Sequence, residues 1–189
     1  LGSFWGYTFA GVWQEDDVNA PFVDANGQTN GKTNGEVYKV KPGNSKYVDV
    51  NKDGVYNDAD QGIIGCGQPT FNWGWNNTFN YKNFDFSFFV VGFHGFDIYN
   101  ATHQMGYNLI KSQQMAGVTP MRELLNRWTP TNTNTDIPGF VKGGTENKDF
   151  FSTRFVENGS FIKMKSITLG YTLPEATCRS LGINNLRVY

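Results

Sequence analysis

The sequence predicts an all-β fold, an antiparallel up-and-down meander that forms part of a large transmembrane β-barrel, with long extracellular loops containing a short helix. Three observations predict it. Aromatic and small polar residues alternate along residues 71–90 with the period of a strand. The apolar side of this alternation consists almost entirely of rings. Connections between the expected strands are alternately very long and very short, as in outer-membrane barrels.

The clearest expected element is a hairpin of residues 70–81 and 84–95 around a tight turn at Lys82 and Asn83. One side carries bulky rings that suit lipid and its interfacial girdles, and the other carries small polar groups that suit a wet interior. The residues predicted to face lipid are Phe71, Trp73, Trp75, Phe79, Tyr81, Phe84, Phe86 and Phe88. Those predicted to line the lumen are Asn72, Asn76, Thr78, Asn80, Asp85 and Ser87.

The remaining elements are expected on either side of this hairpin. The other strands are 3–14, 151–173 and 186–189, and the outer loops are 15–69 and 96–150. Within the second loop, Thr119 is a suitable N-cap and Pro120 a suitable first residue for a short helix that reaches Trp128. A short turn is expected after Pro174.

The segment 151–173 repeats the inverted pattern and adds Ile167, Leu169 and Tyr171 to the lipid-facing set. Lys163 and Lys165 have the same parity as these apolar residues. A lysine at the bilayer midplane costs about 2–4 kcal/mol, and this cost falls toward zero near the interface. That end of the strand is therefore expected above the membrane.

Composition restricts the function. The formal charge is -1 and the pI is about 6.1, so no basic field exists to hold a phosphate backbone, and nucleic acid is not an expected partner. No apolar run approaches the roughly 20 residues of a membrane helix, a criterion that does not apply to strands. The chain starts at Leu1 and ends at Tyr189 inside strand-like runs, so it is expected to be a fragment of a longer protein.

The loop DVNKDGVYNDAD has the spacing of a calcium-binding loop. Gly54 stands at the sixth position, where a sharp turn is needed, and an aspartate replaces the usual glutamate at the twelfth. The predicted ligands of a structural Ca²⁺ are Asp49, Asn51, Asp53, Val55 through its carbonyl, Asn57 and Asp60. The alternative is a turn whose Asp and Asn side chains cap their own backbone.

No catalytic motif is present, and no enzymatic activity is expected. His94 and His103 are the only histidines, and neither belongs to an HExxH motif or neighbours a cysteine. Cys66 and Cys178 lie far apart, outside any CxxC or Cys/His cluster. The sequence contains no GxSxG motif, P-loop or GxGxxG motif, so loop or lumen roles are expected for both histidines.

Several segments occur in the order and spacing of one family. They are GSFWGY, AGVWQ, YVDVNKDGVYNDADQGIIG, FNWGWNNTFNYKNFDFSFFVVGFHGFDIYN, NRWTPTNTNTDIP and ENGSFIKMKSITLGYTLP followed by LGINNLRVY. Together they resemble the C-terminal barrel region of SusC/RagA-type TonB-dependent outer-membrane transporters. The family usually has Arg after the IP of the fifth segment, where this chain has Gly139.

The resemblance implies a barrel of about 22 strands with a plugged lumen, in the outer membrane of a Gram-negative bacterium. The plug domain and the segment that contacts TonB are absent from residues 1–189. The implied partners are a SusD-like surface lipoprotein, the TonB complex through the missing N-terminal region, outer-membrane lipid, and an oligosaccharide or peptide cargo.

A second hypothesis comes from a different class of protein. A secreted, calcium-stabilised β-sandwich that binds carbohydrate would use the same strands and the same loop. It needs a second sheet that covers the faces of Trp73 and Phe86. A glycoside hydrolase is a third option, but no pair of acids can be placed for it.

Overall fold

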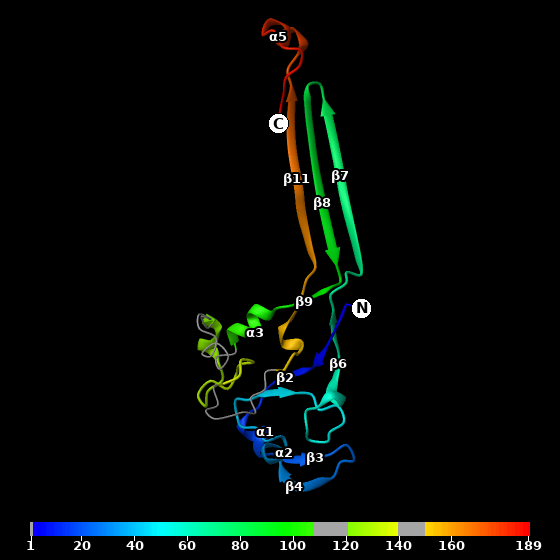
Figure 1. The fold of residues 1–189 in the computed structure, drawn as a ribbon. Coiled ribbons are helices and arrows are strands. Elements are labelled where there is room, and N and C mark those ends of the chain that lie inside the picture. The colour runs from blue at the N-terminus through cyan, green and yellow to red at the C-terminus, as the bar shows by residue number, and fades with distance from the viewer. Residues whose placement is uncertain (1, 108–120, 140–149) are drawn as a thin grey trace. The chain divides into compact units, whose positions relative to one another are not determined.

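The computed structural model describes residues 2–107, 121–139 and 150–189 (Figure 1). The chain divides into two compact units. Unit 1 comprises Leu1–Gly67 and Ile98–Glu157, and unit 2 comprises Gln68–Asp97 and Asn158–Tyr189. None of the helices in the described ranges has the length and apolarity needed to cross a membrane.

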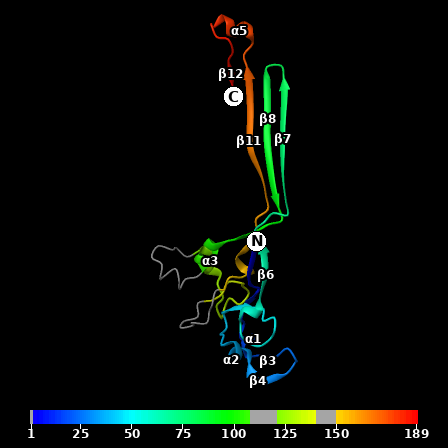
Figure 2. The same ribbon diagram turned by 45° about the vertical axis from the view of Figure 1, so that its right-hand side comes forward.

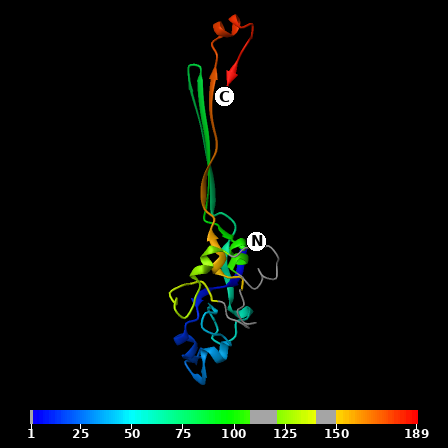
Figure 3. The ribbon, with the colours of Figure 1, turned by 90° about the vertical axis from the view of Figure 1, so that its left-hand side faces the viewer.

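Unit 2 is built on one four-stranded antiparallel sheet (Figures 1 and 2). Its spatial order, β12-β11-β8-β7, follows the order of the chain, so the predicted antiparallel meander is confirmed. Figure 3 shows the sheet from its edge, as a single twisted layer. The strands are β7 (Phe71–Tyr81), β8 (Phe84–His94), β11 (Phe161–Thr172) and β12 (Arg187–Val188).

The segment expected to be one strand, 151–173, contains three elements. They are the 3-10 helix η3 (Thr153–Phe155), the short strand β10 (Val156–Asn158) and β11. The Asn158 side chain accepts a hydrogen bond from the Ser160 amide at 2.8 Å. This local turn competes with the ladder and ends β10, because an Asn side chain can replace a backbone partner.

A helix, α5 (Glu175–Ser180), replaces the short turn expected after Pro174. Proline has no amide hydrogen, so Pro174 cannot continue the β-ladder as a donor, but it loses nothing at the start of a helix. The final strand covers only Arg187–Val188 of the expected 186–189.

The position of Lys163 differs from the expectation because β11 contains a bulge. The register shifts between Met164 and Ser166, where Lys165 is the extra residue. Lys163 is therefore opposite Val91, which is itself opposite Gly74 on the small polar side of β7. A bulge reverses the parity of a strand, so Lys163 leaves the apolar face, and Ile162 and Met164 join it.

Unit 1 has far more structure than the irregular outer loops that were expected. Segment 3–14 is two strands, β1 (Ser3–Tyr7) and β2 (Phe9–Val12). They pair with β6 (Gln61–Cys66) and β5 (Ser45–Tyr47), respectively, and take no part in the four-stranded sheet. Gly11, with φ of 112°, lies at the register shift in β2. The remaining strand pairs are β3–β4 and β9–β10.

The bounds of these elements are as follows. The strands are β1 (Ser3–Tyr7), β2 (Phe9–Val12), β3 (Pro21–Val23), β4 (Thr29–Thr33), β5 (Ser45–Tyr47), β6 (Gln61–Cys66) and β9 (Asp97–Tyr99). The helices are α1 (Glu15–Asn19), α2 (Asn34–Tyr38) and α3 (Ala101–Tyr107), with 3-10 helices η1 (Asp58–Asp60) and η2 (Arg122–Asn126).

A core dominated by aromatic side chains organises unit 1. Trp13, Phe22, Tyr47 and Phe155 are at most 5% exposed. Further buried apolar residues are Tyr7, Val12, Val40, Leu124 and Ile137. Burial of such rings is the main source of stability for a unit with so little regular structure.

The short helix expected from Thr119 to Trp128 is only partly described. Thr119 and Pro120 lie outside the described residues, and the described part is the 3-10 helix η2. Leu124 is 5% exposed and packs into unit 1, whereas Leu125 is 79% exposed.

Candidate membrane-facing sheet and outer-loop sites

The four-stranded sheet has one face that is almost entirely apolar. Residues opposite each other in antiparallel strands share a face, and the register aligns the odd-numbered rings of β7 with the even-numbered rings of β8. Ile167, Leu169 and Tyr171 of β11 are opposite Phe88, Phe86 and Phe84. The register therefore places every residue predicted to face lipid on this one side, which is called the aromatic face below.

Most of the aromatic face is exposed in unit 2, and Phe86, Phe88 and Tyr171 are partly exposed. Exposed fractions on β7 run from 38% for Trp73 to 70% for Tyr81, and Ile162 reaches 73%. Rings on neighbouring strands contact one another. The rings of Trp75 and Phe88, for example, meet edge to face with their centroids 5.3 Å apart. Asn77, which the sequence analysis did not single out, interrupts this face opposite Phe88. A large exposed apolar surface of this kind indicates contact with lipid or with another protein.

The opposite face, here called the small-residue face, contains every residue predicted to line the lumen. Asp85 is opposite Asn80 on one side and Gly170 on the other. A Cβ atom at Gly170 would lie 2.5 Å from Asp85 Oδ1, so the glycine leaves room for the carboxylate. Across this glycine, the Arg187 guanidinium donates to Asp85. The ion pair thus connects β8 with the terminal strand β12.

The loop from Asp49 to Asp60 directs its side-chain oxygens at its own backbone. Asp49 Oδ2 accepts from the Gly54 amide at 2.8 Å, and the two oxygens of Asp60 accept from the amides of Val50 and Asn57. The pKa of Asp53 is lowered, mainly because its carboxylate accepts a hydrogen bond from the Val55 amide. A hydrogen bond from the Asn51 side chain is the second cause. Asp60 is only 3% exposed.

These bonds correspond to the self-capped turn that was the alternative to calcium binding. One feature favours a cation, because Asp49 Oδ1 is buried and has no hydrogen-bond partner. However, the oxygens of Asp60 are both engaged, and Asn51 Oδ1 accepts from the Asp53 amide. Across the described ranges, no group of three acidic, His or Cys side chains is arranged to hold a metal. Calcium binding at this loop stays a prediction.

An aromatic cavity of about 290 Å³ lies beside this loop in unit 1. Tyr38 and Tyr56 stack with centroids 5.2 Å apart, and the Tyr38 hydroxyl donates to Asp49 Oδ2 at 2.8 Å. Burial raises the pKa of Tyr56 to about 12, and burial followed by the Asp49 hydrogen bond raises the pKa of Tyr38. Both phenols therefore stay neutral at physiological pH. The lining residues include Val37, Val40, Tyr47, Val55 and Phe150.

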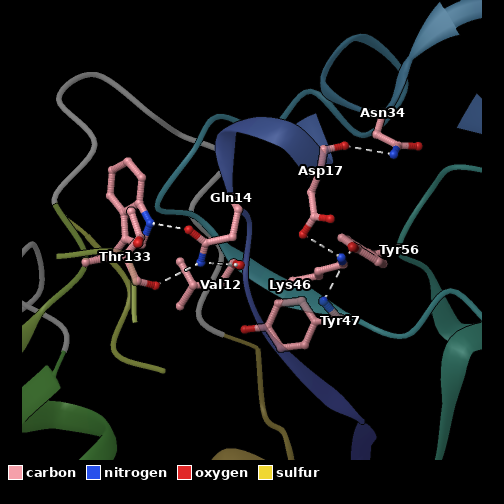
Figure 4. A network of polar contacts seen from close by, with 9 residues as sticks. Val12, Gln14, Asp17, Asn34, Lys46, Tyr47, Tyr56 and Thr133 are labelled. Carbon is pink, nitrogen blue, oxygen red and sulfur yellow. Dashed lines mark hydrogen bonds and ion pairs between the residues drawn. The ribbon is translucent and has the colours of Figure 1, made fainter. Parts of the chain in front are cut away.

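A polar network ties the start of unit 1 to its second half (Figure 4). The Gln14 amide donates to the carbonyls of Val12 and Thr133, and its oxygen accepts from the Trp128 indole at 2.8 Å. Nearby, Lys46 pairs with Asp17 at 2.9 Å. Segments more than 100 residues apart in sequence are joined by one side chain.

The two histidines contact carboxylates or an aromatic ring. His103 lies between Glu123 and Glu157, with its ring nitrogens 3.9 and 3.7 Å from their oxygens. His94 contacts the Phe71 ring in unit 2. Cys66 and Cys178, both in the described ranges, form no disulfide bond, and Cys178 is buried.

The chain is similar over its whole length to curated TonB-dependent receptors. It is 32% identical over 189 residues to TonB-dependent receptor P3 of Formosa agariphila, covering 100% of this chain and 17% of that protein. Identity to receptor P26 of the same organism is 31% over 186 residues, covering 98% of this chain and 17% of that protein. SusC of Bacteroides thetaiotaomicron is 27% identical over 132 residues, with 70% and 12% covered.

Solved structures show the same fold. A structure of the RagAB peptide transporter matches with a TM-score of 0.62 at 20% identity, covering 98% of this chain and 18% of that chain. The RagAB peptide importer in its open-open state matches with a TM-score of 0.64 at 18% identity, covering 98% and 17%. No protein-family model matches the chain.

This chain thus spans about a sixth of the length of the first two curated receptors, at 17% of each. The fold comparison and the full-length sequence matches agree. The chain belongs to the TonB-dependent receptors of the SusC/RagA type and corresponds to a segment of them.

Proposed function

We propose that this chain is part of an active importer in the outer membrane of a Gram-negative bacterium, energised through TonB, with glycans as its main cargo class and peptides as the second. The four-stranded sheet contributes to the barrel wall. The observation that carries this proposal is the aromatic face, whose rings and aliphatic side chains lie on one side of three strands and are mostly exposed. Lipid is the environment that such a face suits.

The relatives support the transport role. One is named SusC, and the similar structures are titled peptide transporter and peptide importer. We propose a SusD-like lipoprotein as the surface partner, and contact with TonB through a part of the receptor outside residues 1–189. The proposed role involves no covalent chemistry. Unit 1, with its aromatic core and polar network, supplies folded structure to the outer loops.

A pair of adjacent substitutions tests the orientation of the wall. Ile167 lies on the aromatic face and Thr168 lies on the small-residue face, opposite Ser87. In the full-length receptor, Ile167→Arg is expected to lower the free energy of unfolding in a bilayer by about 2–4 kcal/mol, whereas Thr168→Arg should have little effect. Equal losses, or a larger loss at Thr168, would contradict the proposal.

The soluble β-sandwich alternative lacks its required second layer. The strands β7, β8, β11 and β12 of unit 2, all of whose residues are described, form a single sheet. Trp73 and Phe71 are 38% and 52% exposed on the face that a second sheet would have to cover. A sandwich core would bury both faces.

A further inference from the structure

The aromatic cavity of unit 1 has a buried base and an accessible mouth. The end of α2, strand β5 and loop 49–60 each form part of its wall, and Phe150 completes it. At the base, Tyr47 and Val40 are 5% and 8% exposed, whereas Val55 at the mouth is 59% exposed. Its volume of about 290 Å³ is close to the lower end of the roughly 300–1,000 Å³ typical of small-molecule sites. The cavity therefore has the size for a small ring-shaped ligand.

Aromatic rings form much of the wall. Tyr47 and Tyr56 meet edge to face at 84° with centroids 5.6 Å apart, and Phe150 meets Tyr47 at 69° with centroids 5.2 Å apart. Among the lining residues, all of which are described, none carries a carboxylate, and Lys39 has the single ammonium group. Such a wall suits a ligand with an apolar surface and without a positive charge.

The phenol of Tyr56 supplies a hydrogen-bond donor to the wall. Its oxygen accepts from the Tyr47 amide at 3.4 Å, so its hydroxyl hydrogen is left to donate. The hydroxyl stays protonated at physiological pH, because burial raises its pKa to about 12. The Tyr38 hydroxyl, in contrast, already donates to Asp49. A ligand in the cavity should therefore bring an acceptor oxygen to Tyr56.

Lys39 at the cavity has a strained backbone. It is the C-cap of α2, with φ of 53° and ψ of 43° in the left-handed region. Glycine is the usual residue in this conformation, because a side chain there is sterically unfavourable. A residue held in such a conformation beside a cavity suggests a role in function. Lys39 is exposed, so its ammonium group is available to donate to oxygens of a ligand.

We propose that this cavity binds one sugar ring of a glycan, at a site formed by residues of unit 1 alone. The proposal rests on the proposed function, in which glycans are the main cargo class. A pyranose ring has apolar C–H faces that suit the tyrosine rings, and oxygens that accept from Tyr56 and Lys39. An apolar peptide side chain would leave the Tyr56 hydroxyl hydrogen without an acceptor, which is costly once water is excluded. The chemistry of the wall therefore favours a sugar over a peptide side chain.

Saturation-transfer difference NMR tests this proposal on the full-length receptor in lipid nanodiscs without sugar-based detergent. The probes are the methyl glycosides of glucose, galactose, mannose, xylose, rhamnose, fucose and glucuronic acid, each offered alone. N-acetylphenylalaninamide represents a peptide side chain. The expected result is saturation transfer to at least one glycoside and none to the amide.

Two exposed valines of the same loop provide a matched pair of variants. Val55 lines the cavity, whereas Val50, 64% exposed, lies outside its lining. Val55→Trp is expected to fill the mouth and abolish transfer to the glycoside, and Val50→Trp should leave it unchanged. Tyr56→Phe keeps the ring and removes the donor, so it should weaken glycoside binding roughly 2–10-fold.

The outcomes separate this proposal from the importer. Transfer that survives in Val55→Trp, an equal loss in both valine variants, or no transfer to any glycoside would overturn the sugar site. Transfer to N-acetylphenylalaninamide that Val55→Trp removes would assign the cavity to peptide side chains instead. None of these results bears on the barrel wall, which the Ile167→Arg and Thr168→Arg pair tests separately.

Discussion

At the scale of single residues, glycines determine how closely unit 1 can pack. Gly54 has a φ of 82°, and a Cβ atom there would lie 2.2 Å from Val37 Cγ1. Gly27 has a similar φ of 76°, but a Cβ atom there would meet nothing within 4 Å. A side chain at Gly27 would therefore cost only the strain of the left-handed backbone, whereas a side chain at Gly54 would also clash with Val37.

Alanine at these two positions should therefore have unequal effects. Gly27→Ala is expected to cost about 1–2 kcal/mol, the price of a left-handed alanine. Gly54→Ala should cost about 1–3 kcal/mol more, because the added methyl group overpacks the cluster. Tryptophan fluorescence during unfolding of the full-length receptor, to which buried Trp13 contributes, measures both free-energy changes. Equal losses would mean that Val37 moves away freely.

The phenol of Tyr56 makes unit 1 sensitive to alkali. Its pKa rises from 10.0 to about 12 on folding, so the folded state retains a proton that the unfolded state has lost in this range. Stability is complete below pH 10.0 and falls as the pH rises toward about 12, by at most about 1.4 kcal/mol per pH unit for this group.

Tyr56→Phe is expected to reduce this alkaline slope. Tyr38, whose pKa is also raised, should keep part of it. Tyrosinate absorbance, followed together with tryptophan fluorescence, reports ionisation and unfolding in one titration. An unchanged slope in Tyr56→Phe would show that Tyr56 does not ionise with unfolding.

At the scale of elements, an ion pair links the two-residue strand β12 to β8. Asp85 lies over Gly170 and pairs with Arg187, which is half exposed. Exposed ion pairs contribute at most about 1 kcal/mol, so the space left by Gly170 matters more than the charge itself.

Gly170→Ala and Gly62→Ala should consequently change the free energy of unfolding in opposite directions. Gly62 is also in a strand, but a Cβ atom there meets nothing within 4 Å. Alanine at Gly62 is expected to stabilise by about 0.4–1 kcal/mol through the unfolded chain. Alanine at Gly170 should destabilise by displacing Asp85. Urea unfolding of the full-length receptor in bilayers measures both changes, and a stabilising Gly170→Ala would refute the packing argument.

The elements that the sequence identified share a simple local signal. The hairpin of β7 and β8 follows from strict alternation around Lys82 and Asn83. The bulge at Lys165 coincides with a change in the alternation, since the apolar residues shift from even positions at Ile162 and Met164 to odd positions from Ile167. The expectation for Lys163 was wrong because it used the parity of Ile167 alone. The helix α5 was missed because six residues after a proline resemble a turn.

The candidate sites show the same division. The Asp49–Asp60 spacing was recognised, but spacing cannot tell whether the oxygens bind a cation or the Gly54 and Asn57 amides. The hydrogen bond between Gln14 and Trp128 joins residues that are 114 apart in sequence. No local sequence pattern predicts such a contact.

At the scale of the whole molecule, unit 1 and unit 2 follow different physical rules. Unit 1 buries its rings, with Trp13 and Phe155 at 3% and 0% exposed. Unit 2 displays its rings, with Trp75 and Phe79 both 57% exposed. Aromatic residues without a period form the core of unit 1, and aromatic residues with a period of two line one face of the sheet in unit 2.

A cysteine scan along β7 of the full-length receptor in bilayers tests the central claim most directly. Each position from Phe71 to Tyr81 carries a spin label, and its collisions with oxygen, which concentrates in lipid, and with a water-soluble nickel complex are compared. The account predicts a period of two, with odd-numbered positions accessible to oxygen and even-numbered positions accessible to nickel or shielded from both. Odd-numbered positions that are accessible to nickel, or an absence of alternation, would contradict it.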